Sequence, residues 1–298
     1  MTIDSQIELS EEAQYMSQSL ALKILAAIRS DAHDRYRKGL SQESQFEIKL
    51  VPSIEAARES LDSPGQQTDV LVIDNMLGDT YEIVREIRYS YPRLIIILVD
   101  EDADFALPGR ADDVSTAPFE NNDLITRIKR LNEDRRLQTL RADALPPVRE
   151  FAKSILKAGK GTSKQQAAVE AVREIGYDYV AFYALTRIET AELMMVAQVG
   201  GEDLKADVPR KPEYDSSLMG WVAQNGQSRI VSPDDEFNHP FVQHGIFQTA
   251  ACVPVGTTLR FGVLVACRKV PQSISQENVM MLELISAQLA SALAKEQR

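Results

Sequence analysis

Cysteine and histidine are scarce in this chain of 298 residues, which has two cysteines and three histidines. Two cysteines are too few for a disulfide framework or a cysteine-based zinc site. The histidines, His33, His239 and His244, are too scattered along the sequence to suggest a metal cluster. We therefore expect no metal site and no resident cofactor.

Long apolar runs and a basic excess are also missing. No stretch reaches the ~18 apolar residues that a membrane-spanning helix needs, so we expect no membrane insertion. The segment Met1–Ser10 lacks the basic and then apolar pattern of a signal peptide, which favours the cytoplasm. Lys and Arg total 33 against 44 Asp and Glu, a net charge of −11. That balance argues against binding nucleic acid or anionic membranes, both of which need a basic surface.

The negative charge is concentrated in the first half of the chain. Residues 1–143 carry 17 basic and 27 acidic side chains, whereas residues 144–298 carry 16 and 17. The pair Pro146-Pro147 lies near this change, where a helix must stop or kink. We expect a flexible N-terminal segment at 1–20, one domain at 21–143 and a second domain at 144–298.

Strand and helix patterns alternate about five times in the first domain. Continuous apolar runs such as Asp69–Asp74 and Leu94–Val99 are typical of strands buried on both faces of a parallel sheet. Helical segments separate them, among them Tyr81–Ser90 and Asn122–Leu140. The pattern predicts an α/β domain with a doubly wound, five-stranded parallel sheet.

The second domain has a different order of elements. Helical segments at Val148–Lys157 and Ser275–Glu296 bracket a run of strands that includes a hairpin from Ile246 to Val270. Helices on either side of consecutive strands predict an α+β domain, with an antiparallel sheet and flanking helices.

Three motifs of the first domain resemble the receiver domains of two-component response regulators. They are Asp69-Val-Leu-Val-Ile-Asp-Asn-Met-Leu77, Tyr91-Pro-Arg-Leu-Ile-Ile-Ile-Leu-Val99 and Ala111-Asp-Asp-Val-Ser-Thr-Ala-Pro-Phe119. The resemblance implies a flavodoxin-like fold, with Asp74 at the position of the phosphorylated aspartate and a cis-proline turn after the fifth strand.

The residues around that aspartate depart from the receiver pattern. Where the resemblance implies an acidic pair for Mg²⁺ after the first strand, the chain reads Ile28-Arg29-Ser30. Asp100 stands in place of a hydroxyl that senses the phosphate, and Ala117 replaces a basic side chain. A carboxylate would repel a phosphoryl group, and phosphoryl transfer to Asp74 needs a cation. We interpret the domain as a pseudo-receiver in which Asp74 is a relic and Arg29 offers it a fixed cation.

The second domain resembles GAF domains, which bind small molecules and dimerise in many sensor proteins. The motifs are Ser217-Leu-Met-Gly-Trp-Val-Ala-Gln-Asn-Gly226, Gly245-Ile-Phe-Gln-Thr-Ala-Ala-Cys-Val-Pro254 and Phe261-Gly-Val-Leu-Val-Ala266. Tyr179, Ala181 and Tyr183 alternate on one strand face. The residues that could line a pocket for an unidentified ligand are Tyr183, Trp221, Phe241, Phe247 and Cys252, and ordinary core packing is the alternative.

The specific uses of GAF domains that we considered find little support. Cys252 and Cys267 both lie in the final hairpin, about three residues out of register. Their position fits neither bilin attachment nor methionine sulfoxide reduction, and inert buried thiols are the better interpretation. The cyclic-nucleotide signature is missing. His239 and His244 are interpreted as loop or surface histidines rather than haem ligands.

The final helix carries an apolar stripe that suggests a dimer. Its residues are Leu282, Ile285, Leu289 and Leu293, and a weaker second face has Met280, Leu284, Ala287 and Ala294. One face must cover the sheet, so two faces suggest a second partner: another subunit or the helix at Asn122–Leu140.

Together these patterns predict a non-enzymatic signal-transduction protein of bacterial type. It would act as a docking or adaptor module for other signalling proteins, through a degenerate receiver and a dimerising or ligand-sensing GAF domain. The alternative is a phosphorylated two-component response regulator that uses Asp74. No nucleophile and base pair or metal set supports an enzyme.

Overall fold

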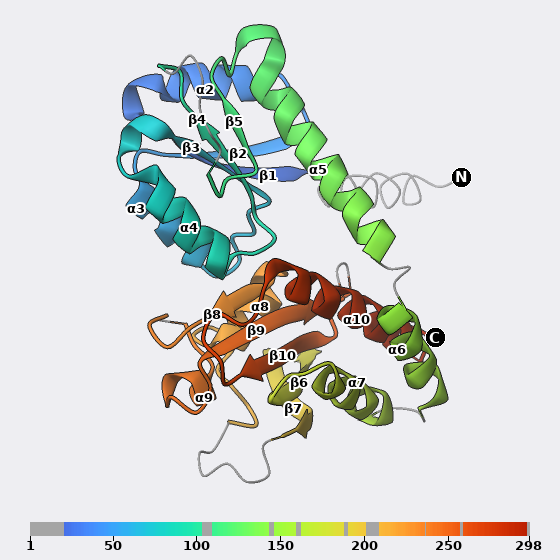
Figure 1. The fold of residues 1–298 in the computed structure, drawn as a ribbon. Coiled ribbons are helices and arrows are strands. Elements are labelled where there is room, and N and C mark those ends of the chain that lie inside the picture. The colour runs from blue at the N-terminus through green and yellow to red at the C-terminus, as the bar shows by residue number, and fades with distance from the viewer. Residues whose placement is uncertain are drawn as a thin grey trace, which may run out of the picture. The chain divides into compact units, whose positions relative to one another are not determined.

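The computed structural model describes residues 21–102, 109–142, 146–158, 162–187, 190–200, 209–235, 237–256 and 259–296. The segment 1–20, where a flexible terminus is predicted, lies outside these residues. The described chain forms two compact units, each with its own five-stranded sheet (Figure 1).

The first unit contains a parallel sheet with the strand order β2-β1-β3-β4-β5. Strands β3 and β4 are buried along their whole length, as expected for continuous apolar runs in the middle of a covered sheet. The five strands are β1 (Leu22–Ala27), β2 (Phe46–Val51), β3 (Val70–Asp74), β4 (Ile95–Val99) and β5 (Asp113–Ser115).

Helices cover both faces of this sheet. Helices α2 (His33–Leu40) and α5 (Asp123–Ala142) share a core with alternate residues of β1, β3 and β4. Helices α3 (Ile54–Asp62) and α4 (Thr80–Ser90) bury their own apolar side chains, as the second layer of a doubly wound fold does. Short 3₁₀ helices lie at Ser30–Ala32, Asn75–Leu77 and Glu120–Asn122. The predicted α/β class is confirmed.

The turn after β5 differs from the one that the receiver resemblance implies. No cis peptide bond occurs in the described residues, so the bond between Ala117 and Pro118 is trans. Asn121 and Asn122 instead adopt left-handed backbone conformations, with φ of 50° and 58°, which asparagine tolerates better than most residues. These asparagines reverse the chain into α5, and the expected cis-proline turn was wrong.

The second unit contains an antiparallel sheet with the order β7-β6-β10-β9-β8. Its strands are β6 (Tyr179–Arg187), β7 (Ala191–Val199), β8 (Arg229–Val231), β9 (Thr249–Val255) and β10 (Gly262–Arg268). The helices are α6 (Pro146–Lys157), α7 (Thr162–Glu174), α8 (Leu218–Asn225), α9 (Pro240–Gln243) and α10 (Gln276–Ala294). The predicted α+β class is confirmed, although β8 and α9 were not predicted.

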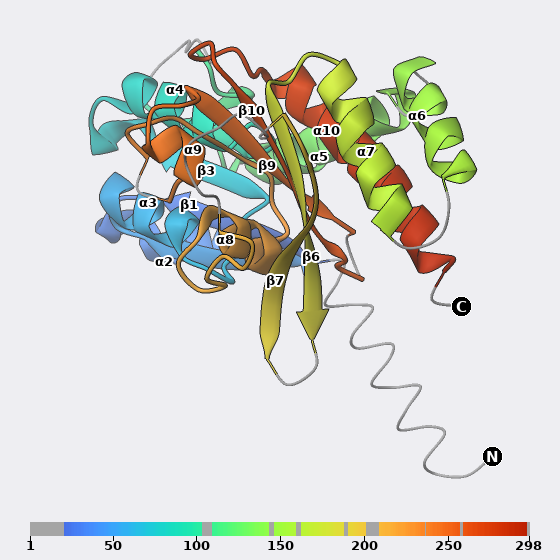
Figure 2. The same cartoon turned by 90° about the horizontal axis from the view of Figure 1, so that it is seen from below.

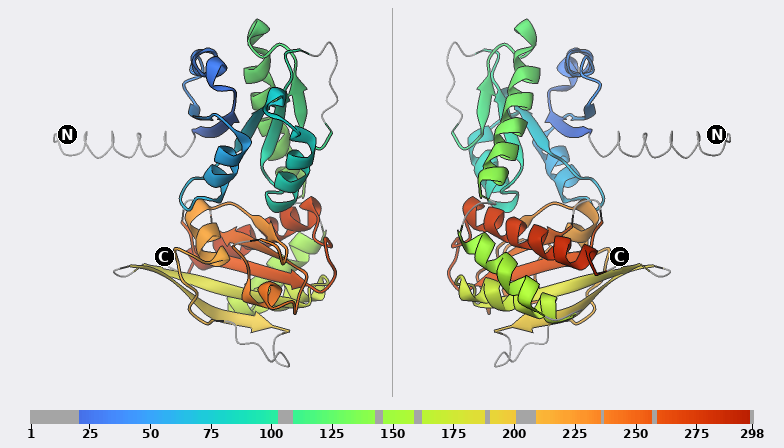
Figure 3. Two further views of the ribbon diagram at one scale, coloured as in Figure 1. Left: turned by 90° about the vertical axis from the view of Figure 1, so that its left-hand side faces the viewer. Right: turned by 90° about the vertical axis from the view of Figure 1, so that its right-hand side faces the viewer.

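One face of the antiparallel sheet is covered by α7 and α10, which run side by side (Figures 2 and 3). Val180, Phe182, Val253 and Leu264 point into this layer and belong to one hydrophobic core cluster with residues of α7 and α10. Because side chains alternate along a strand, their neighbours must point to the other face. Among the described residues, no such pair of long helices covers that second face, where several aromatic side chains lie together.

Among the described residues, we find no helix with the length and apolar character needed to cross a membrane.

Candidate functional site

Asp74 ends strand β3, at the carboxyl edge of the parallel sheet. Its side chain caps the 3₁₀ helix that follows, since Oδ1 accepts a hydrogen bond of 3.0 Å from the backbone N–H of Met76. The residue is 4% exposed. Asp74 is therefore held in a fixed orientation from its own side of the sheet.

The other carboxylate oxygen of Asp74 is occupied by Arg29. β1 and β3 are parallel neighbours, so the chain that leaves β1 passes close to the end of β3. Arg29 Nε donates to Asp74 Oδ2 over 2.8 Å. This hydrogen bond, followed by the charge of Asp74, raises the pKa of the Arg29 guanidinium, which stays charged. The structure thus contains the cation that we expected beside Asp74.

Asp100 takes part in a separate hydrogen-bond network beside this ion pair. Its Oδ2 accepts a hydrogen bond of 2.8 Å from Asn75 Nδ2, and Asn75 Oδ1 accepts a hydrogen bond from the Thr80 hydroxyl. The carboxylate thus orders the loop between β3 and α4. An anion at this position disfavours a phosphoryl group on neighbouring Asp74 by charge repulsion.

Ala117 brings no polar side chain to the edge of the sheet. The nearby arginine of α5, Arg127, is bonded elsewhere: its Nε lies 2.7 Å from Asp123 and its NH1 lies 2.8 Å from Asp113. Ser115 also donates to Asp123. The Arg127 guanidinium is therefore bound by acidic residues of β5 and α5 rather than by Asp74.

No metal-ligating group is assembled in the part of the chain that the structure describes, by the criterion of three or more neighbouring His, Cys, Asp or Glu side chains. Asp31, the nearest acid after β1, is exposed, and its charge adds to the raised pKa of Arg29. Arg29 is therefore the cation that the described residues place at Asp74.

In the second unit, both cysteines lie on the sheet face opposite α7 and α10. Cys252 pairs with Val265 and Cys267 pairs with Ala250, so the thiols are offset by two residues and share one face. The expected offset of three was wrong, because the hairpin loop is longer than its turn residues suggested. Both thiols are completely buried, and burial raises their pKa values, so they stay protonated.

An aromatic cluster covers the cysteine face. Tyr179 makes an edge-to-face contact with Phe241 at 4.8 Å between ring centres, and Phe241 contacts Phe247 at 5.7 Å. The Tyr179 hydroxyl donates to Gln198 Oε1 over 3.1 Å. The three rings come from β6, α9 and the loop after α9. Together they form an apolar layer over this face of the sheet.

His239 belongs to this cluster: it lies in the loop that leads into α9, as one of the two expectations had it, but it is buried and not at the surface. It is fully buried, its ring centre lies 5.5 Å from that of Phe241, and Nδ1 lies 4.0 Å from the sulfur of Cys267. The same nitrogen accepts from the Phe241 N–H and caps α9. Burial lowers the pKa of His239 to about 3, so the ring is neutral.

One polar atom of this cluster, Nε2 of His239, has no hydrogen-bond partner within the described residues. The buried hydroxyl of Tyr183 lies close to that of Tyr179. Trp221, in contrast, lies on α8, with its ring centre 5.1 Å from the guanidinium carbon of Arg229. Of the five predicted lining residues, Trp221 thus lies beside Arg229. The other four belong to the face that carries the cysteines: Tyr183, Phe241, Phe247 and Cys252.

The predicted dimer stripe of α10 lies in the core of its own unit. Its four residues are between 0% and 7% exposed and pack against the sheet: Leu282, Ile285, Leu289 and Leu293. On the second face, Leu284 packs against Val148 of α6. The stripe therefore covers the sheet. On the second face, Ala287 is exposed, whereas Met280 and Ala294 are half-buried.

The antiparallel unit was also compared with known protein families. The profile of the GAF domain matches residues 165–294. Residues 165–294 are a GAF domain. The match includes the sheet, α8, α9 and α10. No match was found among curated proteins.

Solved structures similar to this GAF domain come from several kinds of protein. The GAF domain of an Acinetobacter phosphoenolpyruvate-protein phosphotransferase has 19% identity over 51% of this chain and 92% of its own, with a TM-score of 0.43. A free methionine-R-sulfoxide reductase of Thermoplasma acidophilum has 22% identity over 50% and 96%, with a TM-score of 0.37. A GAF domain of a Bacillus halodurans sensor histidine kinase has 18% identity over 44% and 93%, with a TM-score of 0.36.

The buried neutral His239 predicts an acid-sensitive GAF domain. An unfolded histidine binds a proton near pH 6.5, whereas the folded one does not until about pH 3. The unfolded state then binds more protons as the pH falls, so stability is lost below pH 6.5. Between pH 7 and 4.5 the free energy of unfolding should fall by roughly 2–3 kcal/mol through this residue.

Urea unfolding followed by the fluorescence of Trp221, the single tryptophan, measures this loss. His239→Asn keeps a capping side chain but cannot titrate, so its pH dependence should be weaker by that amount. His244→Asn changes an exposed histidine of the same region and should keep the wild-type slope. Equal slopes for wild type and His239→Asn would show that His239 is not buried in the neutral form.

Proposed function

We propose that the protein is a non-enzymatic signal-transduction protein in which a receiver-like unit serves as a docking module without phosphorylation. The ion pair of Arg29 and Asp74, 2.8 Å long, is the observation that carries this proposal. It supports a unit that keeps the receiver-like sheet and aspartate but uses a protein cation where a metal ion and a phosphoryl group would be needed.

Phosphoryl transfer to a carboxylate requires a free oxygen as nucleophile and cations that neutralise the incoming charge. At Asp74, one oxygen accepts from Arg29 and the other from the Met76 N–H. Attack from Oδ2 would need Arg29 to leave, and the product would face the carboxylate of Asp100. These contacts favour docking over phosphorylation, the alternative function for the same residue.

The GAF domain is proposed as the sensing and dimerising part of the protein. GAF domains occur in signalling proteins, such as the sensor histidine kinase and a methyl-accepting chemotaxis protein among the solved structures. The buried His239 Nε2, which has no hydrogen-bond partner in the described residues, supports a small ligand with a hydrogen-bonding group. Because the thiols are buried and protonated, a thiol-based reduction is not part of the proposal.

Labelling with acetyl phosphate tests the docking proposal. The full chain incubated with Mg²⁺ and acetyl phosphate should show no added phosphoryl group by intact-mass spectrometry, because Arg29 holds Oδ2 of Asp74. A phosphorylation-competent receiver labelled in parallel controls for the reagents. Stoichiometric labelling of wild type that Asp74→Asn abolishes would overturn the proposal and establish the response-regulator alternative.

We propose a homodimer through the second face of α10, because the main apolar stripe of this helix is buried in the core of its own unit. Met280 and Ala294 are half-buried and Ala287 is exposed there. Light scattering at micromolar concentration should give twice 33.2 kDa for wild type. Ala287→Glu should give the monomer mass, whereas Gln276→Glu at the exposed start of the helix should not. A monomer mass for wild type would reject the dimer.

A further inference from the structure

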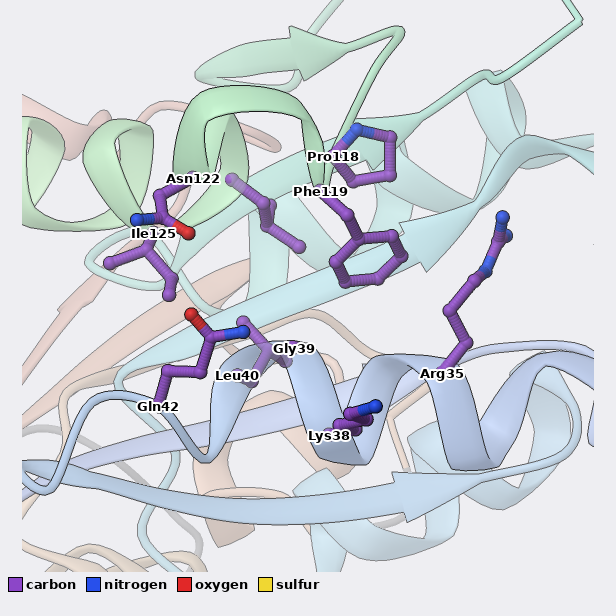
Figure 4. A pocket seen from close by; sticks show the side chains of 10 residues that line it. Arg35, Lys38, Gly39, Leu40, Gln42, Pro118, Phe119, Asn122 and Ile125 are labelled. Atoms are coloured by element: carbon purple, nitrogen blue, oxygen red, sulfur yellow. The ribbon is translucent and has the colours of Figure 1, made fainter.

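A pocket of about 180 Å³ lies between α2 and the start of α5 in the receiver-like unit (Figure 4). Leu40, Phe119 and Ile125 line its apolar part, and Gln42 lies at one end. Arg35 and Lys38 stand on the exposed side of α2 and add positive charge to its rim. The pocket therefore suits an apolar side chain that is flanked by carboxylates.

The shape of this pocket depends on a glycine. A Cβ on Gly39 would collide with the ring of Phe119, so the absence of a side chain at this position of α2 lets the ring lie against the helix. Phe119 also packs edge-to-face on Tyr36, with 4.8 Å between ring centres. These contacts hold the wall of the pocket in place, as a preformed binding site requires.

The rim charge is unusual in a half of the chain with a net charge of −10. Arg35 forms an ion pair with Glu101, whereas Lys38 is exposed and has no ion pair with the described residues. A partner with carboxylates would gain most from Lys38. The chemistry of the pocket thus selects an acidic segment with apolar anchors.

The N-terminal part of the sequence has this composition. Residues 1–20 have four acidic side chains, no lysine or arginine, and apolar residues at Ile3, Ile7 and Leu9. The segment joins the fold at Leu22, whose N–H donates to the Gln45 carbonyl over 2.8 Å. Gln45 is three residues from Gln42, so the point of attachment lies close to the pocket.

We propose that residues 1–20 bind the pocket between α2 and α5 of their own chain. An apolar side chain of the segment fills the space beside Phe119, and its carboxylates interact with Arg35 and Lys38. Attachment through a short linker gives an effective concentration in the millimolar range, so weak contacts suffice for occupancy. An external acidic partner would then have to displace the segment. The inference does not depend on the chemistry of Asp74.

Paramagnetic broadening in the full chain tests this proposal. A spin label attached to Ser10→Cys leaves Cys252 and Cys267 unlabelled, because both thiols are buried and protonated. The backbone amide signals of Gly39, Gln42 and Ile125 should lose most of their intensity. Lys38→Glu should restore it, whereas Arg37→Glu, an equal charge change on an exposed neighbour that does not line the pocket, should not.

Three results would overturn the proposal. One is unchanged intensity at the pocket amides in the labelled wild-type chain. Another is equal restoration by Lys38→Glu and Arg37→Glu, which would indicate general attraction to a basic surface. The third is broadening in a mixture of isotope-labelled chains and separate spin-labelled chains, since the segment would then bind a second copy. Folding of each variant is checked by its amide spectrum outside the pocket, and none of these results bears on phosphorylation of Asp74.

Discussion

Arg29 and Asp74 stand at the carboxyl ends of two neighbouring parallel strands, and their ion pair occupies the oxygen that a phosphoryl group would need. The parallel pairing of β1 with β3 brings the two residues together. In a covered parallel sheet, the strand ends are where polar side chains collect and where ligands bind. The receiver-like unit keeps this geometry and fills it with contacts within the protein.

The surrounding residues strengthen the same arrangement. Met76 donates to the second oxygen of Asp74, and Asn75 connects the adjoining loop to Asp100. In a site built for phosphorylation, we would expect cations that can approach the aspartate and a loop that responds to its charge. Here the loop after β3 is hydrogen-bonded to Asp100 through Asn75. Arg127 forms ion pairs with Asp113 and Asp123. The use that we propose for this arrangement is a fixed surface for a partner.

The sequence predicted the two sheets well, because long apolar runs and alternating patterns report burial directly. The predicted runs Asp69–Asp74 and Leu94–Val99 contain β3 and β4, and the final hairpin was confirmed. The strand-end position of Arg29 also followed from the sequence, since it depends only on where β1 stops. β8 and α9 were missed because three or four residues carry no measurable periodicity.

Other site features depend on tertiary packing and could not be predicted from local sequence. His239 is polar and follows an acidic loop, yet Phe241 and Tyr179 bury it. The stripe of α10 was predicted, but a stripe does not say which surface covers it, and the sheet of its own unit does so. The registers of Cys252 and Cys267 depend on the length of a hairpin loop, which turn residues fix only within a residue or two.

The side-chain signal of Arg29 in a proton–nitrogen correlation spectrum tests the ion pair most directly. In the full wild-type chain, the account predicts a separate, slowly exchanging Arg29 Nε–H resonance, distinct from that of exposed Arg37. Asp74→Asn should move this resonance and speed its exchange, leaving Arg37 unchanged. An Arg29 signal that exchanges as fast as that of Arg37, or that ignores Asp74→Asn, would contradict the account.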